Sequence, residues 1–183
     1  KTAHQWIELN QAKHVLLVGA DVMSRIVDWS DRSTCILFGD GAGAVVLSAS
    51  DKPGLYGVDV SSDGSFSDKL YTTGRGFNSQ DPCYLKMQGR EVYKQAVKVM
   101  ERIVYETLDR HDFKANDLDF LVPHQANIRI IQSLAQHLNL PMDRVVVTIE
   151  KMANTTAASV PLALDFGIVS GQLKPGSLIL VEA

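Results

Sequence analysis

The chain has 183 residues, of which 45% are hydrophobic and 21% are charged, and its formal net charge is −3 at pH 7. A chain of this length can bury roughly 70% of its unfolded surface, so it can build a core without disulfides or a structural metal. The negative balance argues against a nucleic-acid-binding protein, whose footprint is usually basic. Two cysteines, Cys35 and Cys83, cannot by themselves form a zinc site or a disulfide framework, so we expect no metal site and a reducing compartment.

No terminal segment combines the charged start, apolar stretch and cleavage site of a secretory signal. The longest weakly charged run, residues 152–171, approaches the length of a membrane span, but it contains Asn154, Pro161 and Asp165. We interpret this run as a buried helix and expect no membrane attachment. The chain also begins inside a helical pattern without a capping residue, so we expect an internal piece of a longer protein.

The first 50 residues predict one helix and three strands. A helical pattern over residues 1–10 precedes an apolar run at 15–19, which suits a buried strand. Two further apolar runs, 35–38 and 44–47, flank the glycine-rich stretch 39–43, and we interpret them as the strands of a tight hairpin. That stretch lacks the Gly-Lys-Ser/Thr ending of a phosphate-binding loop.

The rest of the chain alternates between strands and helices. Residues 51–84 are rich in Gly, Pro, Ser and Asp, which predicts strands and turns with long connections that serve a site. The elements expected after them are helices at 90–108, 127–138 and 156–169, and strands at 118–122, 145–149 and 177–181. This alternation predicts an α/β architecture with a largely parallel sheet covered by helices.

Two of these strands are followed by residues that could do chemistry. His124 comes directly after strand 118–122, and Asn154 follows strand 145–149. Open α/β sheets place their sites at the carboxyl ends of strands, so neighbouring strands would bring both side chains to one crevice. An imidazole and a carboxamide there could hold a developing oxyanion. The alternatives are a structural histidine at a strand end and an asparagine that caps the following helix.

A second pattern lies at and around the long predicted helix. Basic residues recur every four positions and predict a basic ribbon along that helix: Lys86, Arg90, Lys94, Lys98 and Arg102. A solvated helix face explains this pattern, and so does a docking strip for an acidic partner or a phosphate-bearing ligand.

Five blocks together resemble the β-ketoacyl-acyl-carrier-protein synthase III family of thiolase-fold condensing enzymes. In chain order the blocks are residues 19–21, 31–34, 38–44, 122–127 and 154–161. The resemblance covers essentially the whole chain and implies a thiolase-like, layered α/β/α sheet structure. Residues 1–84 would then be the end of the N-terminal half, with the hairpin and the substrate-channel loops. Residues 85–183 would be the C-terminal half without its final strands.

The resemblance also implies an activity, a decarboxylating Claisen condensation that initiates fatty acid synthesis. A cysteine takes an acyl group from an acyl-CoA such as acetyl-CoA, and malonyl-acyl-carrier-protein then decarboxylates and attacks that thioester. His124 and Asn154 would bind the malonyl thioester carbonyl and stabilise the enolate. The nucleophilic cysteine would precede this segment, so Cys35 and Cys83 are interpreted as structural. The segment alone would then be inactive.

Other residues take their expected roles from local matches within the family. Arg32 resembles an arginine that contacts the nucleotide end of CoA, which suits a planar cation. Arg90, Tyr93 and Ala126 match positions that line the pantetheine channel, although better-known members have asparagine where this chain has Arg90. Ala153 replaces the usual glycine before the asparagine, which restricts the loop backbone.

Partners follow from the same resemblance. Acyl carrier protein is acidic, and we expect Lys94, Lys98 and Arg129 to form its docking surface. The family also implies a cytoplasmic homodimer that uses CoA thioesters and phosphopantetheine-linked substrates, with no separate cofactor and no nucleic-acid or membrane partner. Two alternatives remain: a relative with quinolone, polyketide or hydroxymethylglutaryl-CoA chemistry, and a non-catalytic module that binds CoA or the acyl carrier.

Overall fold

The computed structural model describes residues 1–74 and 83–183. Its α-helices are α1 (Thr2–Glu8), α2 (Gly89–Arg110), α3 (Ile128–His137), α4 (Ile149–Met152) and α5 (Ser159–Val169). Its strands are β1 (His14–Asp21), β2 (Gly41–Ser48), β3 (Leu70–Thr72), β4 (Leu85–Met87), β5 (Phe120–Pro123) and β6 (Ile179–Glu182). Short 3-10 helices are η1 (Met23–Arg25), η2 (Gly64–Phe66), η3 (Ala115–Asp117), η4 (Met142–Arg144) and η5 (Thr156–Ala158).

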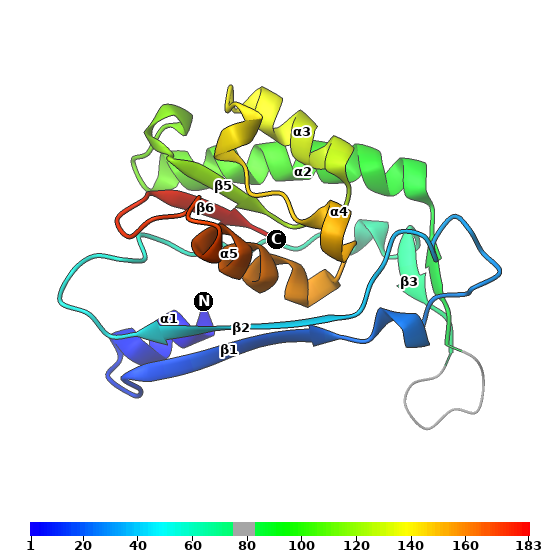
Figure 1. The fold of residues 1–183 in the computed structure, drawn as a ribbon, viewed down its shortest axis with the longest axis horizontal. Coiled ribbons are helices and arrows are strands. Elements are labelled where there is room, and N and C mark those ends of the chain that lie inside the picture. The colour runs from blue at the N-terminus through cyan, green and yellow to red at the C-terminus, as the bar shows by residue number, and fades with distance from the viewer. Residues whose placement is uncertain (75–82) are drawn as a thin grey trace.

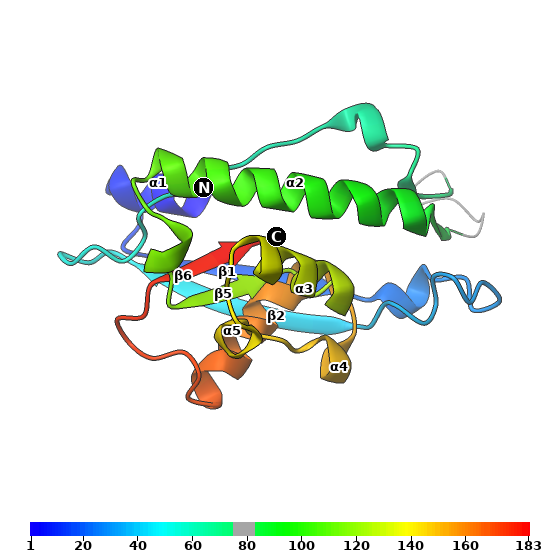
Figure 2. The ribbon, with the colours of Figure 1, turned by 90° about the horizontal axis from the view of Figure 1, so that it is seen from above.

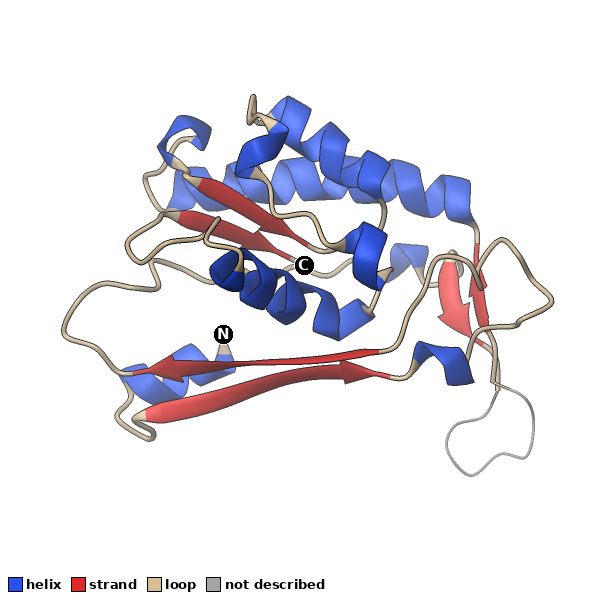
Figure 3. Cartoon of the chain, viewed as in Figure 1, coloured by secondary structure: helices blue, strands red, loops and turns tan. Residues whose placement is uncertain are grey.

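The strands form three separate pairs (Figure 3). β1 and β2 pair antiparallel along their whole length, from His14 opposite Ser48 to Asp21 opposite Gly41. β3 and β4 also pair antiparallel, whereas β5 and β6 pair parallel. Among the described residues, the expected parallel arrangement is therefore confirmed only for β5–β6 and for two isolated bridges, Leu121 with Val145 and Phe38 with Asn154.

The elements stack in layers (Figure 1). Helix α5 lies between the β1–β2 pair and the β5–β6 pair, and it contacts strands of both. The long helix α2 runs beside α3, as the view from above also shows (Figure 2). These two helices and β5 share one buried apolar cluster, whose largest fully buried members include Leu121, Ile131 and Leu134. Each such side chain stabilises the fold by roughly 1.5–3 kcal/mol relative to leaving it exposed.

The predicted helices are confirmed. Residues 90–108 lie within α2, which buries Met100, Val104 and Leu108 at four-residue spacing. Residues 127–138 correspond to α3, with Asn127 as its N-cap, because the Asn127 side chain accepts a hydrogen bond from the Arg129 backbone N–H at 2.9 Å. The predicted helix 156–169 begins as η5 and continues as α5. No helix among the described residues is both long and apolar enough to cross a membrane.

The predicted hairpin is wrong. The run 35–38 is a turn segment, not a strand, and Phe38 forms an isolated bridge with Asn154. The backbone N–H of Asn154 donates to the Leu37 carbonyl at 3.0 Å, and the Gly39 N–H donates to the Asn154 carbonyl at 3.0 Å. The strand that includes 44–47 pairs with β1 instead.

The glycines of this region serve close packing. A Cβ atom at Gly19 would lie 2.1 Å from the carbonyl oxygen of Ala157, and one at Gly43 would lie 2.9 Å from the Pro161 side chain. Glycine is therefore required at both positions, because the segment that leads into α5 approaches the strand backbone. The opposite face of β1–β2 is exposed at Leu16 and Val18, so the expectation of a fully buried strand at 15–19 is also wrong.

The predicted strand 145–149 is replaced by side-chain hydrogen bonding. Only Val145 bridges to β5, and Ile149 already begins α4. In this segment the buried side chain of Gln125 supplies hydrogen bonds to the backbone. Its Oε1 accepts from the N–H groups of Thr148 and Ile149 at 2.8 and 3.2 Å. Its Nε2 donates to the carbonyl of Val146 at 3.1 Å. One amide thus satisfies backbone groups that a regular ladder would pair.

Candidate active site

His124 lies at the carboxyl end of β5, as the sequence predicted. Its backbone N–H donates to the carbonyl of Glu182 on β6 at 2.7 Å. Its ring nitrogen Nδ1 lies 2.5 Å from Oγ of Ser159, the first residue of α5. Burial lowers the pKa of His124 below its ordinary value, so the imidazole is neutral at pH 7. Within the described part of the chain, Nε2 makes no hydrogen bond and can act on a ligand.

Asn154 lies between α4 and η5 and is 8% exposed. Its Oδ1 accepts the backbone N–H of Thr156 at 2.9 Å, which is an Asx turn and not a helix cap, because the N-cap of η5 is Thr155 and no side chain caps that turn. This bond fixes the amide plane. Among residues 1–74 and 83–183 no group accepts from its Nδ2, so the two N–H donors are available. The turn-forming bond of Oδ1 and a role of Nδ2 as a donor to a ligand are therefore compatible.

The loop before Asn154 has a strained backbone. Ala153 has φ 59° and ψ −165°, a region that only glycine adopts readily. The expectation that alanine restricts this loop is confirmed. The strain persists because Asn154 is held on both sides by the backbone bonds to Leu37 and Gly39.

The loops of His124 and Asn154 meet at one hollow. A cavity of about 270 Å³ is lined by Ala126 and Asn127 from the first loop and by Ala153 from the second, together with Ile36 and Ile149, whereas His124 and Asn154 are not among its lining residues. Gln125 and Ser159 also join the two loops by the hydrogen bonds described above. The tertiary structure therefore brings these two segments together, although the strand expected before Asn154 is not formed.

These donors define what the site can do. A neutral imidazole N–H and a carboxamide N–H can both stabilise negative charge that develops on a carbonyl oxygen. Neither group is a strong acid at neutral pH, so neither would readily protonate a carbanion nearby. The pair therefore suits chemistry that passes through an enolate.

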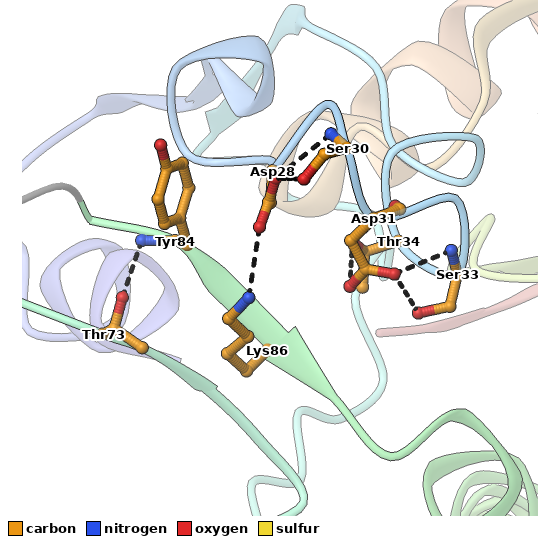
Figure 4. Close-up of polar contacts among 8 residues, drawn as sticks. All are labelled: Asp28, Ser30, Asp31, Ser33, Thr34, Thr73, Tyr84 and Lys86. Atoms are coloured by element: carbon orange, nitrogen blue, oxygen red, sulfur yellow. Dashed lines mark hydrogen bonds and ion pairs between the residues drawn. The ribbon is translucent and has the colours of Figure 1, made fainter.

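Arg32 lies between Asp31 and Ser33 in a turn segment. Figure 4 shows the hydrogen bonds of Asp28 and Asp31 that hold this segment in shape. The carboxylate of Asp28 accepts the N–H and the hydroxyl of Ser30 at 3.1 and 2.6 Å, and Asp31 does the same for Ser33 at 3.0 and 2.6 Å. These bonds lower the pKa of both carboxyl groups. Arg32 itself is exposed and makes no ion pair with any described residue.

The same loop is tied to the strand that leads into α2. Lys86 Nζ lies 3.3 Å from a carboxylate oxygen of Asp28 (Figure 4). In addition, the Leu85 N–H donates to the Ile26 carbonyl at 2.7 Å. Arg90 and Tyr93 follow in the first turns of α2, and both are exposed. The structure therefore links the loop of Arg32 to the start of the helix that bears Arg90 and Tyr93.

The predicted basic ribbon is only partly correct. Lys86 belongs to β4 and pairs with Asp28, so it is not on the helix. Lys94 pairs with Glu91 at 3.6 Å, and Arg102 pairs with Glu106 at 3.1 Å. Among the basic residues expected on the ribbon or the docking surface, the exposed ones that make no ion pair with the described residues are Arg90, Lys98 and Arg129.

The cysteines and the remaining histidines show no organised site. Cys35 is half-buried and Cys83 exposed, both as free thiols, and Cys35 lies in a turn where we expected a strand. In the described ranges, no three His, Cys, Asp or Glu side chains are grouped so that they could hold a metal ion. His111 pairs with Asp59 at 3.3 Å, and His137 lies 3.7 Å from Glu101.

Three residues with clear positional roles were not singled out from the sequence: Asp21, Gln125 and Ser159. All three lie in blocks that matched the family, which was the one available signal. Asp21, at the end of β1, accepts hydrogen bonds from the Thr156 hydroxyl and the Ala157 N–H, two and three residues after Asn154. The Asn154 loop is thus held by two segments: Asp21 of β1 binds Thr156 and Ala157, and residues 37–39 bind the backbone of Asn154.

Two family models match separate parts of the chain. Residues 1–64 match the family model described as 3-oxoacyl-[acyl-carrier-protein] synthase III, and residues 108–183 match the model of its C-terminal part. The chain belongs to this synthase III family. The β-ketoacyl-[acyl-carrier-protein] synthase III of Alkalilimnicola ehrlichii is 49% identical over 186 residues, covering 99% of this chain and 58% of that protein. The corresponding enzyme of Methylococcus capsulatus is 50% identical over 184 residues, covering 99% and 57%.

A solved synthase III structure agrees with the fold. The crystal structure of 3-oxoacyl-[acyl-carrier-protein] synthase III from Aquifex aeolicus superposes with a TM-score of 0.91 at 42% identity, over 98% of this chain and 56% of that one. The thiolase-like α/β architecture expected from the sequence is thereby confirmed. The chain spans a little under three fifths of the length of these synthase III relatives.

Proposed function

We propose that the protein containing this chain catalyses the decarboxylating condensation of an acyl-CoA with malonyl-acyl-carrier-protein and so initiates fatty acid synthesis. Acetyl-CoA is the acyl-CoA that we propose to test first. The observation that supports this most directly is the pair of free donors, Nε2 of His124 and Nδ2 of Asn154, on two loops whose adjacent residues Ala126 and Ala153 line one hollow. The synthase III relatives at 49–50% identity support the same reaction.

In the proposed step, both donors bind the thioester carbonyl oxygen of the malonyl group. Loss of carbon dioxide leaves the electron pair of the broken C–C bond at the α-carbon and on this oxygen, as an enolate. The α-carbon then attacks the acyl thioester on a cysteine, forming a C–C bond and releasing the cysteine thiolate. A donor of this kind contributes roughly 3–4 kcal/mol of transition-state stabilisation. We propose that the nucleophilic cysteine lies outside this segment. Cys35 lies in a turn and Cys83 lies in a loop, and the proposal assigns no general base to either thiol.

The substrate contacts are also proposals. Arg32 binds the nucleotide end of CoA, and Arg90, Tyr93 and Ala126 line the channel for its pantetheine arm. Arg90 makes no ion pair with the described residues, so its guanidinium is available for a phosphate. Ala126 lines the hollow between the two donor loops, as a channel residue should.

The partner contacts follow the charge pattern. Lys94, Lys98 and Arg129 form the docking surface for acyl carrier protein in this proposal, and two of them are free of ion pairs with the described residues. We also propose a cytoplasmic homodimer, with residues 1–84 and 85–183 as parts of its two thiolase-like halves.

The full-length protein, with and without substitutions, tests this function. It should form acetoacetyl-acyl-carrier-protein from acetyl-CoA and malonyl-acyl-carrier-protein, whereas malonyl-CoA should be a poor extender. His124→Ala and Asn154→Ala should each lower malonyl decarboxylation about 100-fold or more, while the acyl-enzyme still forms and is seen by mass spectrometry. Retained decarboxylation in both variants would remove the assigned roles. Absence of any acyl-enzyme would favour a module that only binds CoA or the acyl carrier.

A further inference from the structure

Ser159 is in direct contact with the His124 ring. It is the first residue of α5, is 2% exposed, and has its hydroxyl oxygen 2.5 Å from Nδ1 of His124. The same oxygen accepts the backbone N–H of Gln125 at 3.3 Å. Because Gln125 is itself completely buried and bonded to Val146, Thr148 and Ile149, the Ser159 hydroxyl is held by a rigid neighbour.

The hydroxyl proton has one available acceptor. Within residues 1–74 and 83–183, Nδ1 of His124 is the only acceptor within hydrogen-bonding distance of the Ser159 hydroxyl. Since the oxygen already receives the Gln125 N–H, donation to Nδ1 satisfies every polar atom of the contact. If Nδ1 carried the proton instead, the buried hydroxyl hydrogen would have no partner.

The direction of this bond decides whether Nε2, the ring nitrogen available to a ligand, is protonated. Burial keeps His124 neutral, so only one of its two ring nitrogens is protonated. With Nδ1 as an acceptor from Ser159, the proton is on Nε2, and Nε2–H is a donor. In the other tautomer Nε2 would be a bare lone pair, which repels a developing oxyanion.

We infer that Ser159 is a positioning residue that holds His124 in the Nε2–H tautomer and orients its ring toward the substrate oxygen. The inference rests on the proposed function for the role of Nε2, but the tautomer itself is a property of the protein without substrate. Ser159 contacts no reacting atom in this arrangement. Its effect on the reaction passes entirely through His124.

The test reads the tautomer directly, by 15N NMR of the full-length protein labelled with [15N]histidine. The His124 signals are identified as those lost in His124→Gln. In the wild type at pH 7.5, Nδ1 should have the shift of an unprotonated nitrogen and Nε2 that of an N–H nitrogen. In Ser159→Ala the two shifts should move toward each other, as a mixture of tautomers requires. Malonyl decarboxylation should fall about tenfold with unchanged KM, the effect of losing one hydrogen bond.

Controls separate this role from general damage to the helix. Ser170→Ala removes a hydroxyl from the other end of α5, where it donates to the Gly167 carbonyl at 3.2 Å, and should change neither the tautomer nor the rate. Ser159→Thr keeps the hydroxyl and should restore the wild-type shifts.

A protonated Nδ1 in the wild type would overturn the inference, even if every Ser159 variant fails to fold. An unchanged tautomer in Ser159→Ala would overturn it as well. If the wild-type tautomer is as expected but the full-length protein has no condensing activity, the proposed function fails and the positioning role stands.

Discussion

The carboxylate of Asp21 accepts a hydrogen bond from the backbone N–H of Ala157, 3.0 Å away and 136 positions later in the chain. The same oxygen also binds the hydroxyl of Thr156. Asp21 ends β1, whereas Thr156 and Ala157 begin the turn that follows Asn154. A side chain from one layer thus sets where the loop of another layer lies.

Asp21→Ala should therefore disturb the Asn154 loop. The substitution leaves a backbone N–H and a hydroxyl without their acceptor, at a cost of about 1–3 kcal/mol in the free energy of unfolding. Malonyl decarboxylation should fall in kcat, because Asn154 loses its fixed position. Denaturant unfolding and the decarboxylation assay measure both effects. Asp63→Ala is the matched control, since its carboxylate accepts only from Ser65 in an exposed turn, and an equal loss of kcat there would contradict the assignment.

Ala153→Gly should stabilise the protein. The backbone of Ala153 is in a region that costs a non-glycine residue about 1–3 kcal/mol, and glycine gives back part of this through its larger unfolded-state entropy. A net gain of about 1 kcal/mol should appear as a higher denaturant midpoint. Ala163→Gly, inside α5 at a completely buried position, should have the opposite sign. Destabilisation by Ala153→Gly would show that the strain is absent.

Gln125→Ala should strongly lower the free energy of unfolding, although Gln125 has no proposed contact with a substrate. It removes bonds to the Thr148 and Ile149 N–H groups and to the Val146 carbonyl, all in the interior, at a total cost of about 3 kcal/mol or more. Thermal and denaturant unfolding measure the loss. Gln136→Ala, on the exposed side of α3, should change stability by less than about 0.5 kcal/mol. A similar small effect for Gln125→Ala would mean that the 146–149 segment is held by other contacts.

Glu182→Gln should stabilise the protein at neutral pH and not at pH 4. Burial raises the pKa of Glu182 to about 7 from an ordinary value of 4.5, and Oε2 has no hydrogen-bond partner among the described residues. The unfolded chain releases this proton near pH 4.5 and the folded chain near pH 7. Stability is therefore lost as the pH rises through this window, by about 3 kcal/mol in total. Unfolding of wild type and Glu182→Gln at pH 4, 5.5 and 7.5 measures the difference.

His124 should show the opposite dependence in the same experiment. Its pKa is lowered by burial, so the unfolded state binds the extra proton as the pH falls below about 6.5. Its contribution is complete above that value and is lost on acidification. A Glu182→Gln variant that gains nothing at pH 7.5 would show that the carboxyl group is solvated.

Lys98→Glu and Arg129→Glu should weaken the use of malonyl-acyl-carrier-protein. Each reverses an exposed charge that has no ion pair with the described residues, and should raise the KM for the carrier-linked substrate about fivefold at low salt. The rate with acetyl-CoA in the acylation step should not change. Lys174→Glu, an exposed lysine just before β6, is the control. An equal effect of Lys174→Glu would show that the KM depends on the net charge of the protein and not on a specific docking surface.

The alternation of apolar patterns was enough to predict most strands and all of the α-helices except α4, which begins where a strand was expected to end. The spacing of Met100, Val104 and Leu108 is a local property of a helix face, so α2 could be predicted nearly to its ends. His124 and Asn154 could be singled out because each follows an apolar run that was expected to be a strand, although only the run before His124 forms one. The family blocks then supplied an expected role for each of these residues.

Pairing between distant segments was decided by tertiary structure. The run 35–38 was predicted to be a strand because all four residues are apolar, yet it is a turn segment with Ile36 exposed, and its partner is Asn154 and not the nearby run 44–47. Gln125 and Ser159 are ordinary polar residues along the chain. Their roles arise only because a buried polar atom must find a partner, and that partner is 21 to 35 positions away. Local periodicity encodes which face of an element is apolar, while long-range hydrogen bonding selects which elements meet there.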